Sequence, residues 1–429
     1  MSITDHINYE RLPNGLDTYL LKTPAHDIIM ARIVLPGGTH TVYEHPMRAA
    51  LFGMLMPGGT NGMGRRTVRE TFARLGARVS IAVEAEHLVL TVAARKTAFD
   101  DAFRLAIQCL VAPRVTAREH AEALATLATD IEHSKEDTSA QAALTLRRTF
   151  YQHGHPLWTM SSQERAQDLA RTSLEHVRAF PKDTLTAIGG FACVVGDIRI
   201  RTHAALLKET LAALPGTRPN KSPISHPGNT NQAYASDTIL SMRERMNIDL
   251  LLGIPLALTT EHEDYYALAL GVHVLGGSAT GRLFHSLRTQ KSLTYGAYAT
   301  LAGMTDVHAG FLKAATVVPN DVFAAAQTAL RDDVVRWVEA GVTPKEVAAH
   351  KEEIVGRMQV GLASSAGLLA ALGGTLQSNK PVSHIDEYPN IVASLTPRAV
   401  NRAITTHLDP SLMATVAAGA IDEKGRPLA

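Results

Sequence analysis

The feature that most constrains the fold of this chain is a repeat, since the same order of predicted elements occurs twice. Residues 215–230 (PGTRPNKSPISHPGNT) lie at the middle of the 429-residue chain, are rich in proline and glycine, and show no apolar periodicity. We therefore expect an N-terminal domain at 1–214 and a C-terminal domain at 231–429, joined by a linker at 215–230.

Within each half, alternating apolar segments predict paired strands, and longer amphipathic segments predict helices. The first half opens with a tight-turn signal at Asn14-Gly15, contains a strand pair in RVSIAVEAEHLVLTVAA, and closes with the strand AIGGFACVVGD. The second half contains the strand MNIDLLLGIPL, the helix YYALALGVHVLGG, a strand pair in LTYGAYATLAG and HAGFLKAATV, and the closing strand MATVAAG. This order predicts an α+β fold of two similar halves, each a mainly antiparallel sheet flanked by helices.

Two long predicted helices, one in each half, begin with the same type of signal. Thr116 and Glu119 fit a capping box, and so do Thr343 and Glu346, where Pro344 also suits a first helical turn. These residues mark where the two helices should start.

Composition excludes several classes of protein. The formal net charge is +1 and there is no long run of Lys or Arg, so we expect no nucleic-acid partner. No stretch reaches 18 apolar residues, so no transmembrane segment is expected. The two cysteines, Cys109 and Cys193, lie in apolar segments and are interpreted as buried free thiols.

Several segments, in order along nearly the whole chain, resemble the M16 family of zinc peptidases (pitrilysin- and insulinase-like). They include LPNGLDTYLL, LARTSLEHVRAFPKDTLTAIGGFACVVGD, LGGSATGRLFHSLRTQKSLTYGAYA and YPNIVASLTPRAVNRAITTHLDP. The resemblance implies the duplicated fold of that family, also described as LuxS/metallopeptidase-like. The length is similar to that of the M16B group, whose members pair as two separate chains around a chamber.

Active members of this family carry an inverted zinc motif, H-x-x-E-H, shortly before a Gly-Thr pair. Histidines at i and i+4 face one metal from the same side of a helix, and the Glu can act as general base for the zinc-bound water. Anchored on Gly59-Thr60, the resemblance places Ala50 and Met54 at the two His positions and Gly53 at the Glu position. None of the three can deprotonate water, and one thioether is too soft to hold zinc alone.

The family's third zinc ligand, a downstream Glu, corresponds to Asp130, which we interpret as a solvated or ion-paired helix residue. Two other segments contain His and acidic residues. HTVYEH (40–45) spaces its histidines at i and i+5, which points them apart, and HSKED (133–137) lacks a second His. We therefore expect no metal and no other cofactor in this chain.

A second motif of the family is intact. In LFHSLRTQKSLTY, Arg288 and Tyr295 occupy the positions of the family's Arg/Tyr pair, which in relatives faces the zinc across the chamber. Arg can hold substrate carbonyl or carboxylate groups through forked hydrogen bonds, and Tyr can donate to the oxyanion of a tetrahedral intermediate. Gly276-Gly277 and Gly281 are interpreted as a helix-ending turn, because no Walker Lys-Ser/Thr follows.

The resemblance therefore implies a non-catalytic, substrate-binding subunit of a heterodimeric peptidase. A homologous M16B partner with an intact H-x-x-E-H would supply zinc, this chain would supply Arg288 and Tyr295, and exposed strand edges would bind the peptide substrate by β-augmentation. Without that partner, a homodimer is compatible with the sequence.

Two other functions are also compatible with the sequence. One is structural, since inactive M16-like chains also form core proteins of respiratory complex III; the other is an independent metalloenzyme with unusual ligands. The opening MSITDHINYERLPNG lacks the basic and apolar regions of a signal peptide, and the sequence does not decide between bacterial cytoplasm and periplasm.

Overall fold

The computed structural model describes residues 2–23, 27–39, 45–155, 157–217 and 235–428. The chain divides into two compact units, each assembled from three segments. Unit 1 consists of Met1–Ile131, Gln163–Ser225 and Met358–Glu387, and unit 2 consists of Glu132–Ser162, His226–Arg357 and Tyr388–Ala429.

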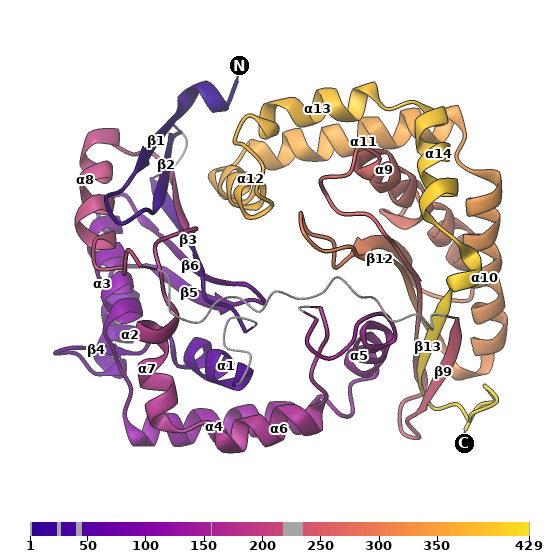
Figure 1. The fold of residues 1–429 in the computed structure, drawn as a ribbon, viewed down its shortest axis with the longest axis horizontal. Coiled ribbons are helices and arrows are strands. Elements are labelled where there is room, and N and C mark those ends of the chain that lie inside the picture. Colours follow the sequence, from indigo (N-terminus) through magenta and orange to yellow (C-terminus); the bar gives the residue numbers. More distant parts are fainter. Residues whose placement is uncertain (1, 24–26, 40–44, 156, 218–234, 429) are drawn as a thin grey trace. The chain divides into compact units, whose positions relative to one another are not determined.

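The sheet of unit 1 has six strands in the order β1-β2-β8-β3-β6-β5 (Figure 1). Neighbouring strands are antiparallel except β2 and β8, which run parallel. The strands are β1 (Ile7–Arg11), β2 (Asp17–Lys22), β3 (Ile28–Pro36), β5 (Arg78–Val83), β6 (His87–Arg95) and β8 (Phe191–Gly196), and a separate two-stranded ladder joins β4 (Gly59–Thr60) to β7 (Pro113–Arg114).

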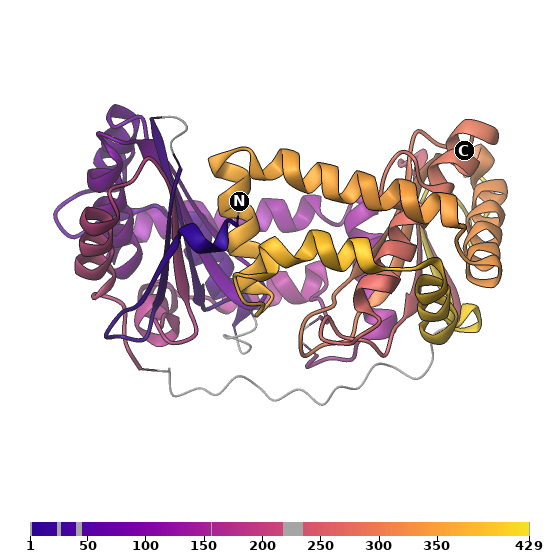
Figure 2. The same cartoon turned by 90° about the horizontal axis from the view of Figure 1, so that it is seen from above.

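The helices of unit 1 cover both faces of this sheet. One face packs against a large apolar core to which α1, α3, α7 and α8 contribute, and the other face packs against α12. Figures 1 and 2 show α3 and α8 on one side of these strands and α12 on the other. The elements are η1 (Thr4–His6), α1 (Pro46–Leu55), α2 (Arg65–Arg74), α3 (Phe99–Val111), α4 (Ala117–His133), α6 (Ser162–Arg171), α7 (Leu174–Thr184), α8 (Ile200–Leu211) and α12 (Ser365–Gln377).

The sheet of unit 2 has five strands in the order β11-β12-β10-β13-β9. Only β13 and β9 are parallel neighbours. The strands are β9 (Ser236–Ser241), β10 (Asn247–Pro255), β11 (Ala297–Ala302), β12 (Phe311–Pro319) and β13 (Ala414–Gly419). The helical elements are α5 (Thr138–Phe150), α9 (Tyr265–Gly276), η2 (Phe284–Gln290), η3 (Asn320–Val322), α10 (Phe323–Ala340), α11 (Pro344–Leu362), α13 (His384–Ser394), α14 (Pro397–His407) and η4 (Pro410–Leu412).

The two sheets have the same topology, apart from the additional edge strand β1. In each sheet the last strand of the half, β8 or β13, lies parallel to β2 or β9 and antiparallel to β3 or β10. Because each sheet is formed within one half of the sequence, the expected α+β fold of two similar, mainly antiparallel halves is confirmed. The parallel pairs and strand β9 were not predicted, because their partners lie far apart in the sequence.

One helix in each unit comes from the other half of the chain. In unit 1, Leu369 and Leu372 of α12 pack on the sheet face that carries Cys193. In unit 2, α5 lies beside β13 (Figure 1), and its Leu146 and Phe150 pack on that sheet. The packing units therefore differ from the consecutive domains 1–214 and 231–429, since each contains a segment of the other half.

These two helices approach their sheets closely because glycine stands at the contacts. A Cβ on Gly253 of β10 would lie 2.6 Å from Phe150 Cε2, and a Cβ on Gly373 of α12 would lie 2.9 Å from Arg32 Cδ. Polar contacts add to the packing: Thr138 donates to Asp249 Oδ2 at 2.6 Å, and Arg32 donates to Gln377 Oε1 at 2.6 Å. Both helices are therefore held by apolar and polar contacts, which local sequence patterns do not reveal.

Several local predictions are confirmed. Gly15 has φ of +87° in the turn between β1 and β2, and its N–H donates to Leu12 O. Cys109 and Cys193 are buried free thiols, and burial raises the pKa of Cys109 to about 12. Most of the predicted linker, residues 218–230, lies outside the described residues.

Among the described residues, no single helix has the length and apolar character needed to cross a membrane. One bent pair, α11 with α12, meets the length and composition criteria together, with an angle of 116° between its helices.

Candidate functional site

The degenerate zinc motif lies on α1. Ala50, Gly53 and Met54 are each partly exposed on this helix, beside the buried Leu51 and Phe52. A Cβ on Gly53 would lie 2.9 Å from Val83 Cγ2 on β5. The absence of a side chain at this position therefore lets α1 pack against the edge strand of the sheet, in addition to removing the general base.

A cavity of about 690 Å³ adjoins Met54 in unit 1. Helix α4 contributes Ala123 and Thr126 to its lining, and α2 contributes Arg65 and Arg69. No His lines this cavity in the described part of the chain, so it offers no imidazole to a zinc ion.

Asp130 lies on the exposed face of α4 and does not line that cavity. It attracts the guanidinium of Arg165, whose pKa is lowered by burial and raised by this carboxylate. The interpretation of Asp130 as a solvated or ion-paired helix residue agrees with these surroundings.

The other two segments with His and acidic residues have structural roles where they are described. Residues 40–44 of HTVYEH lie outside the described residues, and His45 stands at the start of α1, 3.1 Å from Asp168 Oδ1. In HSKED, His133 is an exposed residue at the end of α4, and Asp137 caps α5 by accepting from the N–H of Ala140.

Arg288 lies on η2, a π-helical turn between α9 and β11. Its Nη1 donates to the backbone carbonyl of Tyr295 at 3.0 Å, and its guanidinium lies 4.9 Å from the centre of the Phe284 ring. These contacts fix the guanidinium beside Tyr295, while the residue as a whole is exposed. The structure therefore brings the two predicted residues together within unit 2.

Tyr295 precedes the edge strand β11 and is 90% exposed. The turn that carries it is anchored by the buried Thr294, whose hydroxyl donates to Val317 O at 2.7 Å. The preceding Ser292 has φ of +51°, a left-handed conformation that costs a non-glycine residue energy. The turn thus holds an aromatic hydroxyl in solvent, and the phenol ring makes little contribution to packing.

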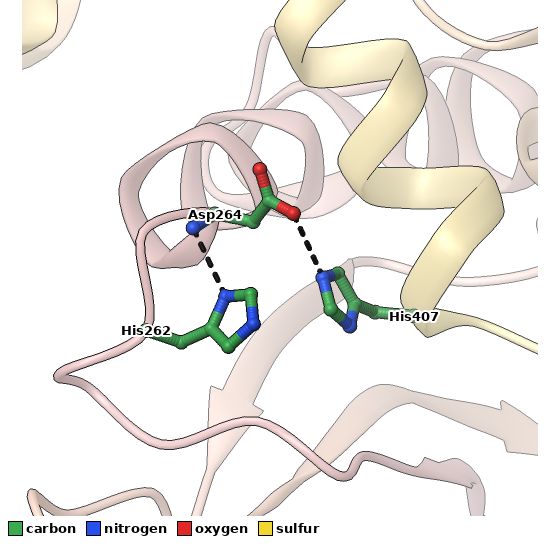
Figure 3. Close-up of side chains that lie close together, drawn as sticks. All are labelled: His262, Asp264 and His407. Atoms are coloured by element: carbon green, nitrogen blue, oxygen red, sulfur yellow. Dashed lines mark hydrogen bonds and ion pairs between the residues drawn. The ribbon is translucent and has the colours of Figure 1, made fainter.

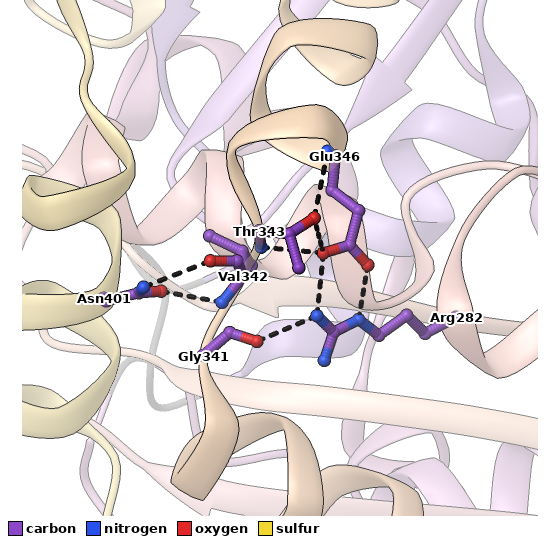
Figure 4. Close-up of polar contacts among 6 residues, drawn as sticks. All are labelled: Arg282, Gly341, Val342, Thr343, Glu346 and Asn401. Carbon is purple, nitrogen blue, oxygen red and sulfur yellow. Dashed lines mark hydrogen bonds and ion pairs between the residues drawn. The ribbon is translucent and has the colours of Figure 1, made fainter.

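A polar network at the start of α11 fixes the loop that leads from α9 to η2 (Figure 4). Arg282 donates to Glu346 through Nε at 2.6 Å and Nη2 at 2.8 Å, and Nη2 also donates to Gly341 O at 2.8 Å. Glu346 accepts from Thr343 as well, which confirms the predicted capping box. The bonds from Arg282, more than those from Thr343, lower the pKa of Glu346 to about 2.

The equivalent capping box in unit 1 is also present, because Glu119 accepts from the N–H and hydroxyl of Thr116 at 2.8 Å. Burial raises the pKa of Glu119, but the bonds from Thr116 and the charges of Arg65 and Arg114 together outweigh this effect, so its pKa is lowered overall.

The predicted glycine turn ends α9 at Gly276. A Cβ there would lie 2.5 Å from the backbone nitrogen of Ala299 on β11, and a Cβ on Gly281 would lie 2.9 Å from Gly276 Cα. Only glycine allows these segments to approach so closely.

Two groups of His and acidic side chains in unit 2 were not identified from the sequence. In the first, His262 and His407 of α14 lie on either side of Asp264 at the start of α9 (Figure 3). His407 Nε2 lies 3.0 Å from Asp264 Oδ2, and His262 Nδ1 accepts from the Asp264 N–H at 3.1 Å. Arg402 donates to the other carboxylate oxygen at 2.7 Å, and it lowers the pKa of Asp264 more than His407 does. The polar atoms that make these contacts therefore have partners within the protein.

The second group consists of His273, His350 and Glu353, whose ligand atoms lie within 4.8 Å of one another. The sequence does contain one signal for it, because His350 and Glu353 stand at i and i+3 and therefore share one face of a helix. No sequence signal connects His273 to that pair, since it lies on another helix.

Comparisons with known proteins agree with this geometry. Residues 172–354 match the family described as Peptidase M16 inactive domain. An uncharacterized zinc protease from Streptomyces coelicolor is 26% identical over 215 residues, which is 47% of this chain and 45% of that protein. This chain therefore matches less than half the length of that curated relative.

Solved structures share the fold over nearly the whole chain. The crystal structure of a peptidase M16 inactive domain from Pseudomonas fluorescens has a TM-score of 0.86 and 22% identity, covering 96% of this chain and 98% of that one. A protease from Helicobacter pylori has a TM-score of 0.83 and 14% identity, covering 96% and 99%. The periplasmic protease PqqL from Escherichia coli has a TM-score of 0.79 and 14% identity, covering 97% of this chain and 46% of that protein.

The duplicated sheets and their helices define a chain with an M16-like peptidase fold. The segment that matches the M16 inactive domain, residues 172–354, lies within this fold. The sequence of the chain contains no H-x-x-E-H.

Proposed function

We propose that this chain is the non-catalytic, substrate-binding subunit of a heterodimeric M16B peptidase. A homologous subunit with an intact H-x-x-E-H supplies the zinc, the general base and the activated water. This chain supplies Arg288 and Tyr295. The observation that carries the proposal is the side chain of Tyr295, which is 90% exposed. It lies beside the guanidinium of Arg288, which donates to the backbone carbonyl of Tyr295.

The arrangement suits recognition of a peptide during hydrolysis. In the described part of the chain, Arg288 uses one nitrogen for Tyr295 O, which leaves further N–H groups for a substrate carbonyl or carboxylate. The Tyr295 hydroxyl can donate to the oxyanion that forms when water attacks the peptide carbonyl. Interactions of this kind stabilise the transition state without any metal in the chain that makes them.

Edge strands support binding of an extended peptide. β5 is an edge strand of the first sheet and β11 is an edge strand of the second, and Tyr295 precedes β11 by two residues. A peptide that pairs with such an edge gains backbone hydrogen bonds with little dependence on its sequence. We therefore expect selectivity for extended, unfolded segments of peptide substrates.

The test uses the chain reconstituted with the M16 subunit that carries H-x-x-E-H and co-purifies with it. Tyr295→Phe keeps the ring and removes one oxyanion donor, so kcat should fall about a hundredfold. Tyr298→Phe is the matched control, because Tyr298 is a nearby exposed tyrosine on β11 whose ring lies 5.3 Å from Lys313 Nζ. Its turnover should be unchanged.

In the same assay, Arg288→Ala should act mainly through KM if the guanidinium holds substrate and transition state alike. Unchanged turnover of the Tyr295→Phe pair would contradict the proposal. It would favour the structural alternative, in which this chain serves only for assembly, as inactive M16-like core proteins do.

A further inference from the structure

Unit 2 contains a group of potential metal ligands apart from Arg288 and Tyr295. His273 lies near the end of α9, and His350 and Glu353 lie one turn apart on α11. His350 Nδ1 is 3.2 Å from Glu353 Oε2, and His273 Nε2 is 3.5 Å from the same oxygen. Three side chains from two helices therefore converge on one point.

Each imidazole has one buried nitrogen without a hydrogen-bond partner among the described residues. His350 is 5% exposed, and neither its Nδ1 nor His273 Nε2 has a hydrogen-bond partner among the described residues, since both contacts to Glu353 lack hydrogen-bond geometry. Buried polar atoms nearly always have partners, so two orphans that face one carboxylate require an explanation.

The surroundings of the group orient its members. The hydroxyls of Ser278 and Thr280 each donate to Glu353 Oε2 at 3.1 Å, and Arg357 donates to Oε1. A Cβ on Gly277 would lie 2.0 Å from His273 Nδ1, so only glycine leaves room for this ring. Supporting contacts of this kind fix the orientation of metal ligands in proteins.

We propose that His273, His350 and Glu353 form a binding site for a divalent transition metal, with zinc as the best fit. A tetrahedral zinc ion with Zn–N bonds of about 2.0–2.1 Å holds its ligand atoms about 3.3–3.4 Å apart, close to the separations of 3.2 Å and 3.5 Å seen here. Two imidazoles select against Mg²⁺ and Ca²⁺, which prefer oxygen ligands.

The duplication of the fold relates two of these ligands to residues that line the cavity beside Met54 in unit 1, whereas Asp130 corresponds to Arg357. His350 and Glu353 follow the capping residue Thr343 at the same spacings at which Ala123 and Thr126 follow Thr116. Ala123 and Thr126 line the cavity beside Met54 in unit 1. The proposal therefore departs from the sequence-based expectation of a metal-free chain, which rested on unit 1, and it does not depend on the proposed peptidase role.

The charge of Arg357 opposes binding of a cation, so the site should be of moderate affinity. The other His and carboxylate group differs in its imidazole nitrogens, because His262 Nδ1 accepts from a backbone N–H and His407 Nε2 lies 3.0 Å from Asp264 Oδ2. That group serves as an internal control for binding to surface histidines.

The test is titration of the chelator-stripped full chain with Zn²⁺ by calorimetry and with Co²⁺ by visible absorption. We expect one equivalent of either metal, a ligand-field band for Co²⁺, and a higher Tm with Zn²⁺. Glu353→Gln preserves size, and it should weaken binding by more than the roughly 10–100-fold that loss of an outer contact costs. His350→Ala should abolish the Co²⁺ band, and His262→Ala should leave it unchanged.

Three results would overturn the proposal: no bound metal in the wild-type chain, equal binding by the Glu353→Gln variant, or an equal loss in the His262→Ala variant. Circular dichroism of each variant shows whether it is folded. If His350→Ala fails to fold, Glu353→Gln and the Co²⁺ spectrum of the wild type still decide the question.

Discussion

The helix pair α1–α4 of unit 1 and the helix pair α9–α11 of unit 2 arise at corresponding points of a duplicated fold, but they carry different chemistry. In unit 1 the pair offers Ala50, Gly53 and Met54 beside an open cavity without histidine in the part of the chain that is described. In unit 2 the pair offers two imidazoles and a carboxylate. In two regions with similar backbones, a few side chains therefore determine whether potential metal ligands are present.

The comparison also shows how packing can prevent a lost site from returning. Gly53 is in contact with β5, because an added Cβ would lie 2.9 Å from Val83 Cγ2. Val83 is β-branched and has little rotamer freedom to move away. A longer side chain at position 53 would therefore have to shift α1 or the strand. This shift would affect the packing of α1 as well as metal binding.

The largest effect is expected from an attempt to restore the motif with Ala50→His, Gly53→Glu and Met54→His. Overpacking at position 53 should lower the free energy of unfolding by about 3 kcal/mol, and the triple variant should bind zinc poorly because Asp130 is exposed and does not line the adjacent cavity. Urea unfolding and zinc analysis measure both effects. Tight zinc binding with full activity would show that unit 1 has kept its site.

A comparison of Gly53→Ala with Gly356→Ala isolates the contribution of packing at position 53. Gly356 lies in α11, where an added Cβ meets nothing within 4 Å. Gly356→Ala should therefore stabilise the chain by up to about 1 kcal/mol through helix propensity, whereas Gly53→Ala should not. Equal stabilisation by both would contradict the role of the Val83 contact.

A smaller effect should separate the two capping boxes. Glu346 forms a two-nitrogen pair with Arg282, but Glu119 accepts only from Thr116. Glu346→Gln should cost about 2 kcal/mol of unfolding free energy at pH 7, and Glu119→Gln about 1 kcal/mol. Chemical unfolding of both variants measures the difference, and equal costs would contradict the importance of Arg282.

The Glu346 contribution should also depend on pH in a defined direction. Its pKa in the folded chain is about 2, below the ordinary value of 4.5, so the ionised form stabilises the fold above pH 4.5. This stability should be lost as the pH falls from 4.5 towards 2, and Glu346→Gln should flatten that part of the profile.

Local signals in the sequence predicted much of the fold. Capping residues at Thr116 and Thr343 and the turn at Gly15 depend on neighbours in the sequence, and the structure confirms them. The exchange of α5 and α12 between the units could not be predicted, because it depends on contacts such as Gly253 with Phe150 between distant segments. The same limit applies to the candidate sites: Arg288 and Tyr295 lie within one motif, whereas His273 reaches His350 only through the packing of two helices.

The most direct test of the proposed function is peptide hydrolysis by this chain alone, by its H-x-x-E-H partner alone, and by the reconstituted pair, with one fluorogenic peptide. We predict that this chain alone shows no hydrolysis above background, even with zinc added, and that the pair exceeds the partner alone by about a hundredfold or more in turnover, as expected for the gain of an oxyanion donor. Chelator-sensitive hydrolysis by this chain alone, or equal turnover by the partner with and without it, would contradict the account.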